Sequence, residues 1–227
     1  VLAELDIYSR RVEATRTGST GGRDIRNAIG TALIIVESPT KARTIAAMFG
    51  KPAKRVIGET IVFETVIPVD SNRIYVASIA ASLGHIVDLV TDEGIHGVRV
   101  ERGRYVPIYD FITKCRSCGS QHIGIYDRCP YCGSDNVYQS FKTYNVLKKL
   151  ALDVDQVFIG TDPDTEGEKI AFDLMTLLAP FNRSIKRIEF HEVTRRAVLE
   201  ALRKPRSVDI KKVEAQVARR IADRWVG

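Results

Sequence analysis

The sequence predicts an α/β protein: a doubly wound parallel sheet with an inserted four-cysteine zinc ribbon and helices at the C-terminal end. Three observations lead to this fold class. Apolar segments typical of buried strands alternate with segments of helical period, two Cys-x-x-Cys pairs interrupt the alternation, and the segment from Asp209 onward has helical period alone. With 227 residues, 44% of them hydrophobic, the chain can bury a sizeable core.

The charge balance is basic. Lys and Arg total 34 against 28 Asp and Glu, and the resulting charge of +6 favours a polyanionic partner. No stretch of about eighteen apolar residues occurs and the N-terminus lacks the pattern of a secretory signal, so we expect a cytoplasmic protein with no membrane segment. Since the chain does not begin with Met and stops within a motif described below, we expect it to be part of a longer polypeptide.

The first elements follow from composition and helix punctuation. Residues 1–30 are rich in Gly, Ser, Thr and Arg toward their end, which predicts a linker or the end of an upstream domain. From Thr31 the apolar run "ALIIVE" predicts a strand covered on both faces. In "SPTKARTIAAMFG", Ser38 suits an N-cap, Pro39 the first helical position and Gly50 the C-terminal stop of a helix.

The alternation of strands and helices continues along the chain. Further strands are predicted at Arg73–Ala80, Gln156–Thr161 and Ile185–Val193, with a helix at 166–179 between the last two. Crossovers of this type are typical of a parallel sheet, in which ligands bind beyond the carboxyl ends of the strands. The apolar face of that helix carries Ile170, Leu174, Leu177 and Leu178.

Carboxylates gather where two of these strands end. Glu37 closes the first strand, and the segment "DPDTEGE" after the third contains Asp162, Asp164 and Glu166. Acidic residues at a helix N-terminus can serve the helix dipole alone, and we assign this structural role to Glu168. The remaining acids exceed that need. Because Mg²⁺ prefers carboxylate oxygens and retains waters that a phosphate can displace, the acids predict a magnesium site.

All four cysteines lie in one short segment. Cys115 and Cys118 form one Cys-x-x-Cys pair and Cys129 and Cys132 the other, each followed by Gly, which is the pattern of a zinc ribbon. Two disulfides are the alternative, but such short loops strain a disulfide and nothing indicates secretion. His122 is expected on the surface. The ribbon could contact nucleic acid or act as a purely structural brace, and the sequence favours neither role.

Five motifs together resemble a known family. In order they read "ALIIVESPTKARTIAAMFG", "SLGHIVDL", "GTDPDTEGEKIAFDL", "RIEFHEVT" and "VEAQVARRIADRWVG", and they resemble the successive motifs of type IA DNA topoisomerases, from the Toprim domain into the adjoining helical domain. A zinc ribbon inside the Toprim domain is similar to the arrangement in the reverse gyrase family. Thr165 stands where many other type IA enzymes carry Arg, which agrees with that closer resemblance.

The resemblance implies a domain organisation. It places the Toprim domain at 31–110 and 141–193, the zinc ribbon at 111–140, and the start of a helical DNA-binding domain at 194–227. The tyrosine that attacks DNA in these enzymes would lie outside this chain. So would the helicase-like domain that uses ATP. Both would be partners on the same polypeptide or on another subunit, and the protein would be associated with the nucleoid.

The resemblance also implies roles for individual residues. Glu37 would protonate the leaving 3′ oxygen during cleavage of a DNA strand and take the proton back during religation, while Lys41 would stabilise phosphate charge. His85 in "SLGH" would lie near the acids. The implied catalytic set is Glu37, Lys41, Asp162, Asp164 and Glu166; the Mg²⁺ ligands are Glu37, Asp162, Asp164 and Glu166; and the single-stranded DNA contacts are Lys41, His85, Arg219, Arg220 and Arg224.

Two other classes combine a four-cysteine zinc module with a Toprim domain. A recombination-mediator protein would bind DNA without catalysis, and a bacterial-type primase would polymerise. In both, the zinc module precedes the Toprim domain. Here Cys115 to Cys132 follow Glu37 and precede Asp162, which favours the topoisomerase and leaves the recombination mediator as the alternative.

Overall fold

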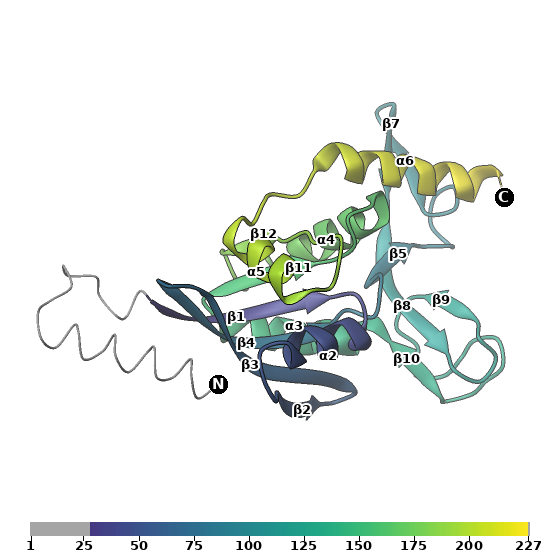
Figure 1. Cartoon of the computed structure of the whole chain (residues 1–227). Helices are drawn as coiled ribbons and strands as arrows, with labels where there is room; N and C mark the ends of the chain where they lie inside the picture. The colour runs from purple at the N-terminus through teal and green to yellow at the C-terminus, as the bar shows by residue number, and fades with distance from the viewer. Residues whose placement is uncertain (1–27, 227) are drawn as a thin grey trace, which may run out of the picture.

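A computed structural model describes residues 28–226. Its centre is a six-stranded sheet in the order β12-β11-β1-β4-β3-β2 (Figure 1). The strands of this sheet are β1 (Ile29–Val36), β2 (Ala53–Ile57), β3 (Thr60–Asp70), β4 (Arg73–Ala81), β11 (Gln156–Gly160) and β12 (Ile185–Arg187). The helices are α2 (Pro39–Ala47), α3 (Ser140–Leu152), α4 (Thr165–Leu178), α5 (Arg195–Arg203) and α6 (Ile210–Val226).

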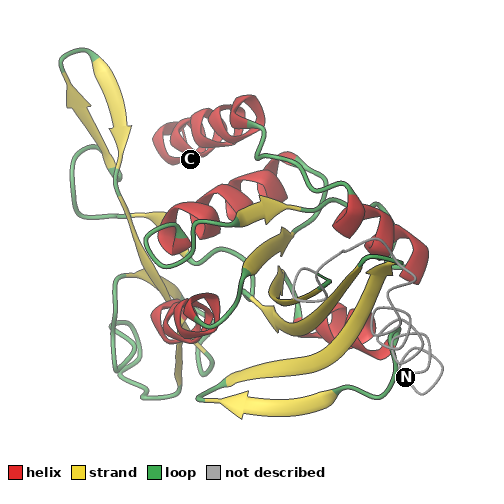
Figure 2. Cartoon of the chain, turned by 90° about the vertical axis from the view of Figure 1, so that its left-hand side faces the viewer, coloured by secondary structure: helices red, strands yellow, loops and turns green. Residues whose placement is uncertain are grey.

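The middle of the sheet is parallel and covered on both faces. β1 pairs in parallel with β4 and with β11, and β11 pairs in parallel with β12. Apolar side chains of α2 and α5 pack on one face, and those of α3 and α4 pack on the other. Figure 2 shows helices on both sides of the sheet. Residues 32–36 of β1 are fully buried between these layers. The four predicted strands and the doubly wound α/β class are therefore confirmed.

One edge of the sheet differs from the prediction. The hairpin of β2 and β3 adds two strands beyond β4, and β3 runs antiparallel to β4, so the sheet is mixed. The sequence did not reveal β2, because most of its side chains are exposed and no apolar run marks it. The fourth predicted strand is also shorter than expected and ends at Arg187.

The helix ends follow local sequence. Ser38 caps α2, since its hydroxyl accepts a hydrogen bond from the Lys41 amide at 3.2 Å, and Pro39 occupies the first turn as predicted. α2 ends at Ala47, and Gly50 follows with φ +126°. The linker predicted for residues 1–30 falls largely outside the described residues, although β1 already begins at Ile29. No helix within 28–226 has the length and apolarity needed to cross a membrane.

A long insertion separates β4 from α3. It contains β5 (Val87–Leu89), the hairpin of β6 (Val98–Glu101) and β7 (Arg104–Pro107), and then β8 (Tyr109–Cys115), β9 (Gln121–Ile123) and β10 (Val137–Gln139). The last three strands carry the cysteine segment, which projects from the main sheet (Figure 1). α6 packs on α4, and its Trp225 contacts Tyr105 of the β6–β7 hairpin edge to face.

Candidate active site and metal centre

Three parallel strands deliver polar residues to one rim of the sheet. Glu37 directly follows β1, His85 lies in the loop after β4, and Asp162 lies in the loop after β11. The Asp162 amide donates a hydrogen bond of 2.7 Å to Glu37 Oε1, which links the segments that follow β1 and β11. Lys41, in the first turn of α2, places its Nζ 2.5 Å from Asp162 Oδ1 and 3.8 Å from Glu37 Oε2.

The two neighbouring carboxyl groups differ in acidity. Burial raises the pKa of Glu37, and the negative charge of Asp162 adds to this effect, although the hydrogen bond from the Asp162 amide opposes it. The pKa of Asp162 is lowered, chiefly by its hydrogen bond from Lys41. One group can therefore hold a proton where the other stays ionised, which is the division that acid–base chemistry between two carboxyl groups requires.

The other two acids lie further along the rim. Asp164 caps α4, since its Oδ1 accepts a hydrogen bond of 2.6 Å from the Gly167 amide. Glu166 is exposed and lies 3.3 Å from His85 Nε2. Among residues 28–226, only the cysteines bring three or more potential ligand atoms within 4.8 Å of one another. The carboxylates thus line an open rim, which suits an ion that takes one or two protein carboxylates and keeps several waters.

A buried arginine that sequence reasoning missed supports the acidic loop. Arg187 is 1% exposed, and its Nη2 donates to the Asp162 carbonyl at 2.8 Å while Nη1 donates to the Ile159 carbonyl at 3.1 Å. It therefore fixes the backbone on both sides of the turn after β11. The only signal in the sequence was a charged residue within the predicted strand Ile185–Val193.

Glycine is required in the same turn. A Cβ at Gly167 would lie 2.2 Å from the Asp162 carbonyl oxygen, so no other residue fits there without moving the acidic loop. The Thr161 hydroxyl donates to the Gly167 carbonyl at 2.6 Å and closes the turn from the other side. The loop that carries the acids is thus held by backbone contacts on several sides.

Glu168 has a structural role, but it acts as the buried partner of two arginines and not, as the sequence indicated, through the helix dipole alone. Its side chain is fully buried, and its two oxygens accept hydrogen bonds of 2.8 and 2.7 Å from Arg206 and one of 2.6 Å from the Asp209 amide. Arg187 Nε lies 3.5 Å from the same carboxylate. Burial alone would raise the pKa of Glu168, but these hydrogen bonds and positive charges lower it to about 2. The carboxylate joins α4 to the segment that leads into α6.

The three predicted DNA-binding arginines of α6 differ in their surroundings. Arg220 donates to both carboxylate oxygens of Asp88, and Arg224 donates to the Leu89 carbonyl at 3.2 Å, so both hold α6 against β5. Arg219 is exposed, and its nearest carboxylate is that of Asp223 at 3.8 Å. In this conformation, Arg219 is the member of the three that is free to meet a ligand.

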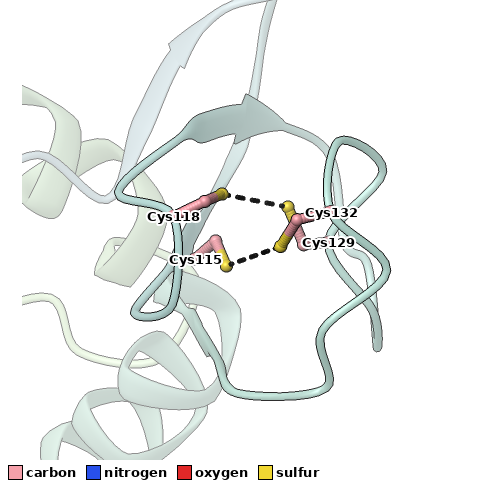
Figure 3. Close-up of side chains that lie close together, drawn as sticks. All are labelled: Cys115, Cys118, Cys129 and Cys132. Carbon is pink, nitrogen blue, oxygen red and sulfur yellow. Dashed lines mark hydrogen bonds between the residues drawn. The ribbon is translucent and has the colours of Figure 1, made fainter.

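The four cysteines converge as predicted. The Sγ atoms of Cys115 and Cys132 lie 3.6 Å apart, and those of Cys118 and Cys129 lie 3.7 Å apart (Figure 3). A disulfide requires about 2.05 Å, whereas four sulfurs at about 2.3 Å from a tetrahedral zinc ion are separated by about 3.8 Å. All four cysteines are free. The cluster therefore has the geometry of a zinc site and excludes the disulfide alternative.

The environment of the sulfurs lowers the pKa of one thiol and raises that of another. The Ser120 hydroxyl lowers the pKa of Cys129 to about 5. The pKa of Cys132 rises to about 12, because its hydrogen bonds with the other sulfurs outweigh the backbone hydrogen bond at Ser134 that opposes the rise. His122, expected on the surface, is half-buried with Nε2 2.9 Å from Ser120 Oγ and 3.4 Å from Cys129 Sγ. His122 thus contacts Cys129, one of the four proposed zinc ligands, and helps to hold that side chain in the sulfur cluster.

Comparison with known proteins agrees with this geometry. The Toprim domain model matches residues 32–193. Reverse gyrases from Pyrococcus horikoshii and Pyrococcus furiosus are 46% and 47% identical to the chain over its whole length, which spans 14% and 19% of theirs. The structure of full-length topoisomerase I from Thermotoga maritima superposes with a TM-score of 0.55 and 32% identity, over 86% of this chain and 24% of that one. The chain belongs to the Toprim domain family.

Proposed function

We propose that the chain is the Toprim segment of a type IA DNA topoisomerase of the reverse gyrase kind. In this role it supplies the acid and the metal-binding half of a site that transiently cleaves and religates one DNA strand. The observation that supports this proposal most directly is the rim of the sheet. There Glu37, with its raised pKa, contacts the ionised Asp162 and lies beside Lys41. The similarity to reverse gyrases over the whole chain supports the proposal.

Each group has a step in the proposed mechanism. Protonated Glu37 donates its proton to the leaving 3′ oxygen as the phosphodiester breaks, and it accepts the proton back when the strand is rejoined. Lys41 and the N-terminus of α2 balance the charge that develops on the phosphate. Arg187 keeps the Asp162 backbone in place during both steps.

Two metals belong to the proposal. Asp162, Asp164 and Glu166, with Glu37 when it is ionised, would hold Mg²⁺, which supplies positive charge to the scissile phosphate when bound. The four cysteines would hold one structural Zn²⁺. ATP would act only in a helicase-like domain beyond this chain, and the attacking tyrosine would come from a further topoisomerase domain.

The proposal predicts a divided activity. The chain alone is expected to leave supercoiled plasmid uncut, because the attacking tyrosine is expected outside this chain and the hydroxyl of Tyr109, which shares a cavity with His85 and Glu166, is buried. A tyrosine-bearing domain from a related enzyme, fused or added in trans, should restore Mg²⁺-dependent nicking. Glu37→Gln should then lower the nicking rate by about 10²–10⁴-fold, since the amide keeps the size of the side chain but carries no proton to give. Gel assays of plasmid topology measure this.

Glu64→Gln provides the matched control. Glu64 lies on β3 and pairs with Arg55 of the edge strand β2, away from the rim, so this variant should retain full activity. A covalent 5′-phosphotyrosine adduct on the chain by itself, or full activity of the Glu37 variant, would contradict the proposed division of the site.

The magnesium assignment has its own test. At a Mg²⁺ concentration about 100-fold above Kd, binding to the folded state should stabilise the chain by about 2.7 kcal/mol and raise Tm by about 5–10 °C. Asp164→Asn removes one carboxylate but keeps a good helix cap, so it should lose most of this rise without a large change in basal stability. Thermal melts with and without Mg²⁺ measure the effect. Asp153→Asn, at the opposite end of β11, should respond as the wild type does; an equal response of the Asp164 variant would remove this residue from the site.

A further inference from the structure

A path of contacts joins the start of α6 to the acidic rim. Asp209, which precedes α6, donates its amide to Glu168 Oε1 at 2.6 Å, and Arg187 Nε lies 3.5 Å from Oε2 of the same carboxylate. Arg187 Nη2 donates to the Asp162 carbonyl at 2.8 Å, and the Asp162 amide donates to Glu37 Oε1 at 2.7 Å. An unbroken series of contacts therefore leads from a helix to two of the proposed Mg²⁺ ligands.

Arg206 holds the middle of this path. Its Nη1 and Nη2 donate to the two oxygens of Glu168 at 2.8 and 2.7 Å, which fixes the orientation of that carboxylate. Its backbone is paired with that of Arg187, since each amide donates to the carbonyl of the other residue at 2.8 and 2.9 Å. The side chains of Glu168 and Arg187 are fully buried, whereas that of Arg206 is 31% exposed. Arg206 thus reaches from the surface to both buried members of the path.

A second contact ties α6 to the acidic segment. The hydroxyl of Thr165, which lies between Asp164 and Glu166 in the sequence, donates to Gln216 Oε1 of α6 at 3.2 Å. α6 is therefore linked to this segment at its start and again in its second turn. Displacement of α6 would leave buried charged and polar groups without partners unless the acidic segment moved with it, and unpaired buried groups are costly.

We propose that Arg206 is a positioning residue for the magnesium site, and that docking of α6 and binding of Mg²⁺ strengthen each other. This inference rests on the proposed function and deepens it, because it gives α6 a part in setting the metal affinity of the rim. Arg206 forms no hydrogen bond or ion pair with the proposed Mg²⁺ ligands, all of which lie in the described part of the chain; it acts through Glu168 and Arg187 on the backbone of Asp162. Such coupling is reciprocal, so each event favours the other by the same factor.

The Mg²⁺ affinity of Arg206 variants tests the first half of the inference. Titration with MgCl₂, followed by amide NMR spectra of the chain, gives Kd and also shows whether each variant is folded. Arg206→Ala removes both hydrogen bonds to Glu168 and should weaken Mg²⁺ binding by at least about 5-fold, the lower end of typical coupling between sites. Arg206→Lys keeps the charge but cannot hold both carboxylate oxygens in the same way, so its Kd should be intermediate.

Arg203→Ala is the matched control. Arg203 is also a partly buried arginine that joins two elements, since its Nε donates from the end of α5 to the Val69 carbonyl of β3 at 2.8 Å. Its truncation is therefore similar in kind but lies outside the path. Because effects of independent sites add, the Kd of this variant for Mg²⁺ should stay within about 2-fold of the wild-type value.

The wild-type chain provides a second measurement that needs no variant. The Val213 amide closes the first turn of α6 on the Asp209 carbonyl, and its hydrogen exchange should be faster than that of β1, so that it reports opening of α6 alone. Saturating Mg²⁺ should slow this exchange by at least about 5-fold. Unchanged exchange at Val213, or a wild-type Kd in the folded Arg206→Ala chain, would overturn the inference and leave the proposed function intact. Absence of Mg²⁺ binding to the wild-type chain would overturn the magnesium assignment and the inference together.

Discussion

Removal of zinc is expected to unfold the cysteine segment while the main sheet stays folded. Within this segment, the buried apolar cluster contains a single residue besides the cysteines, Val137, so hydrophobic burial cannot hold it together. Zinc binding to small four-ligand modules has an apparent free energy of about 10–16 kcal/mol, which far exceeds what one valine contributes. After chelation, amide hydrogens of β9 and β10 should exchange quickly and those of β1 should remain protected.

Two variants sharpen this experiment. Cys129→Ser should reproduce the exchange pattern of the zinc-free protein. Tyr131→Ala, between two of the sulfur ligands but with a side chain 80% exposed, should keep both the metal and the protection of the segment. Elemental analysis gives the zinc content. Absence of zinc from the purified chain, or loss of protection in β1 together with the cysteine segment, would contradict the prediction.

Glu168→Gln is expected to destabilise the whole chain by about 3–5 kcal/mol. The amide cannot neutralise Arg187, which is buried, or Arg206, which donates two hydrogen bonds to the carboxylate. Unpaired buried charge is among the costliest defects in a protein interior, and a loss of this size lowers Tm by about 6–20 °C for a chain of this length. Chemical denaturation of the variant and the wild type provides the measurement.

The same ion pair predicts a dependence on pH. Because the pKa of Glu168 falls from an ordinary value of 4.5 to about 2 on folding, its contribution is complete above about 4.5 and is lost as the pH falls toward 2. The Gln variant should lose less stability than the wild type over this window. Glu200→Gln, an exposed acid on α5, is the control and should behave as the wild type does. If Glu168→Gln lowers the free energy of unfolding by less than about 1 kcal/mol, water reaches Arg187 and Arg206 in the variant.

The parts of the fold that sequence predicted are those where local pattern and burial agree. Residues 32–36 of β1 and 157–159 of β11 are apolar because helices cover both faces, and Ser38 and Pro39 mark a helix start by their own chemistry. β2 escaped prediction because its stability comes from hydrogen bonding to β3 and not from burial of its side chains. Edge strands of this kind leave little trace in hydrophobic periodicity.

The candidate site divides in a similar way. Glu37 and Asp162 could be placed on one rim, because the ends of parallel strands converge. Arg187 could not, since its role depends on the Asp162 and Ile159 carbonyls, which only the folded backbone brings within reach. The attachment of Arg220 to Asp88 spans 132 residues and is likewise invisible to local pattern. Roles that follow from residue type and from the position of a strand end could be predicted. Roles that depend on contacts between residues far apart in the sequence could not.

The insertion between β4 and α3 also has a consequence for the rate of folding. Pairing of β1 with β11 joins residues 124 positions apart, as in the contact of Thr31 with Asp155, and such high contact order makes a chain fold slowly. A zinc ion bound to both Cys115 and Cys132 would shorten the chain between β1 and β11 by 17 residues. This changes the free-energy cost of closing that loop by only about 0.1 kcal/mol. The refolding rate of the sheet should therefore be nearly the same with and without zinc, and the cysteine segment and the sheet should form as separate kinetic units.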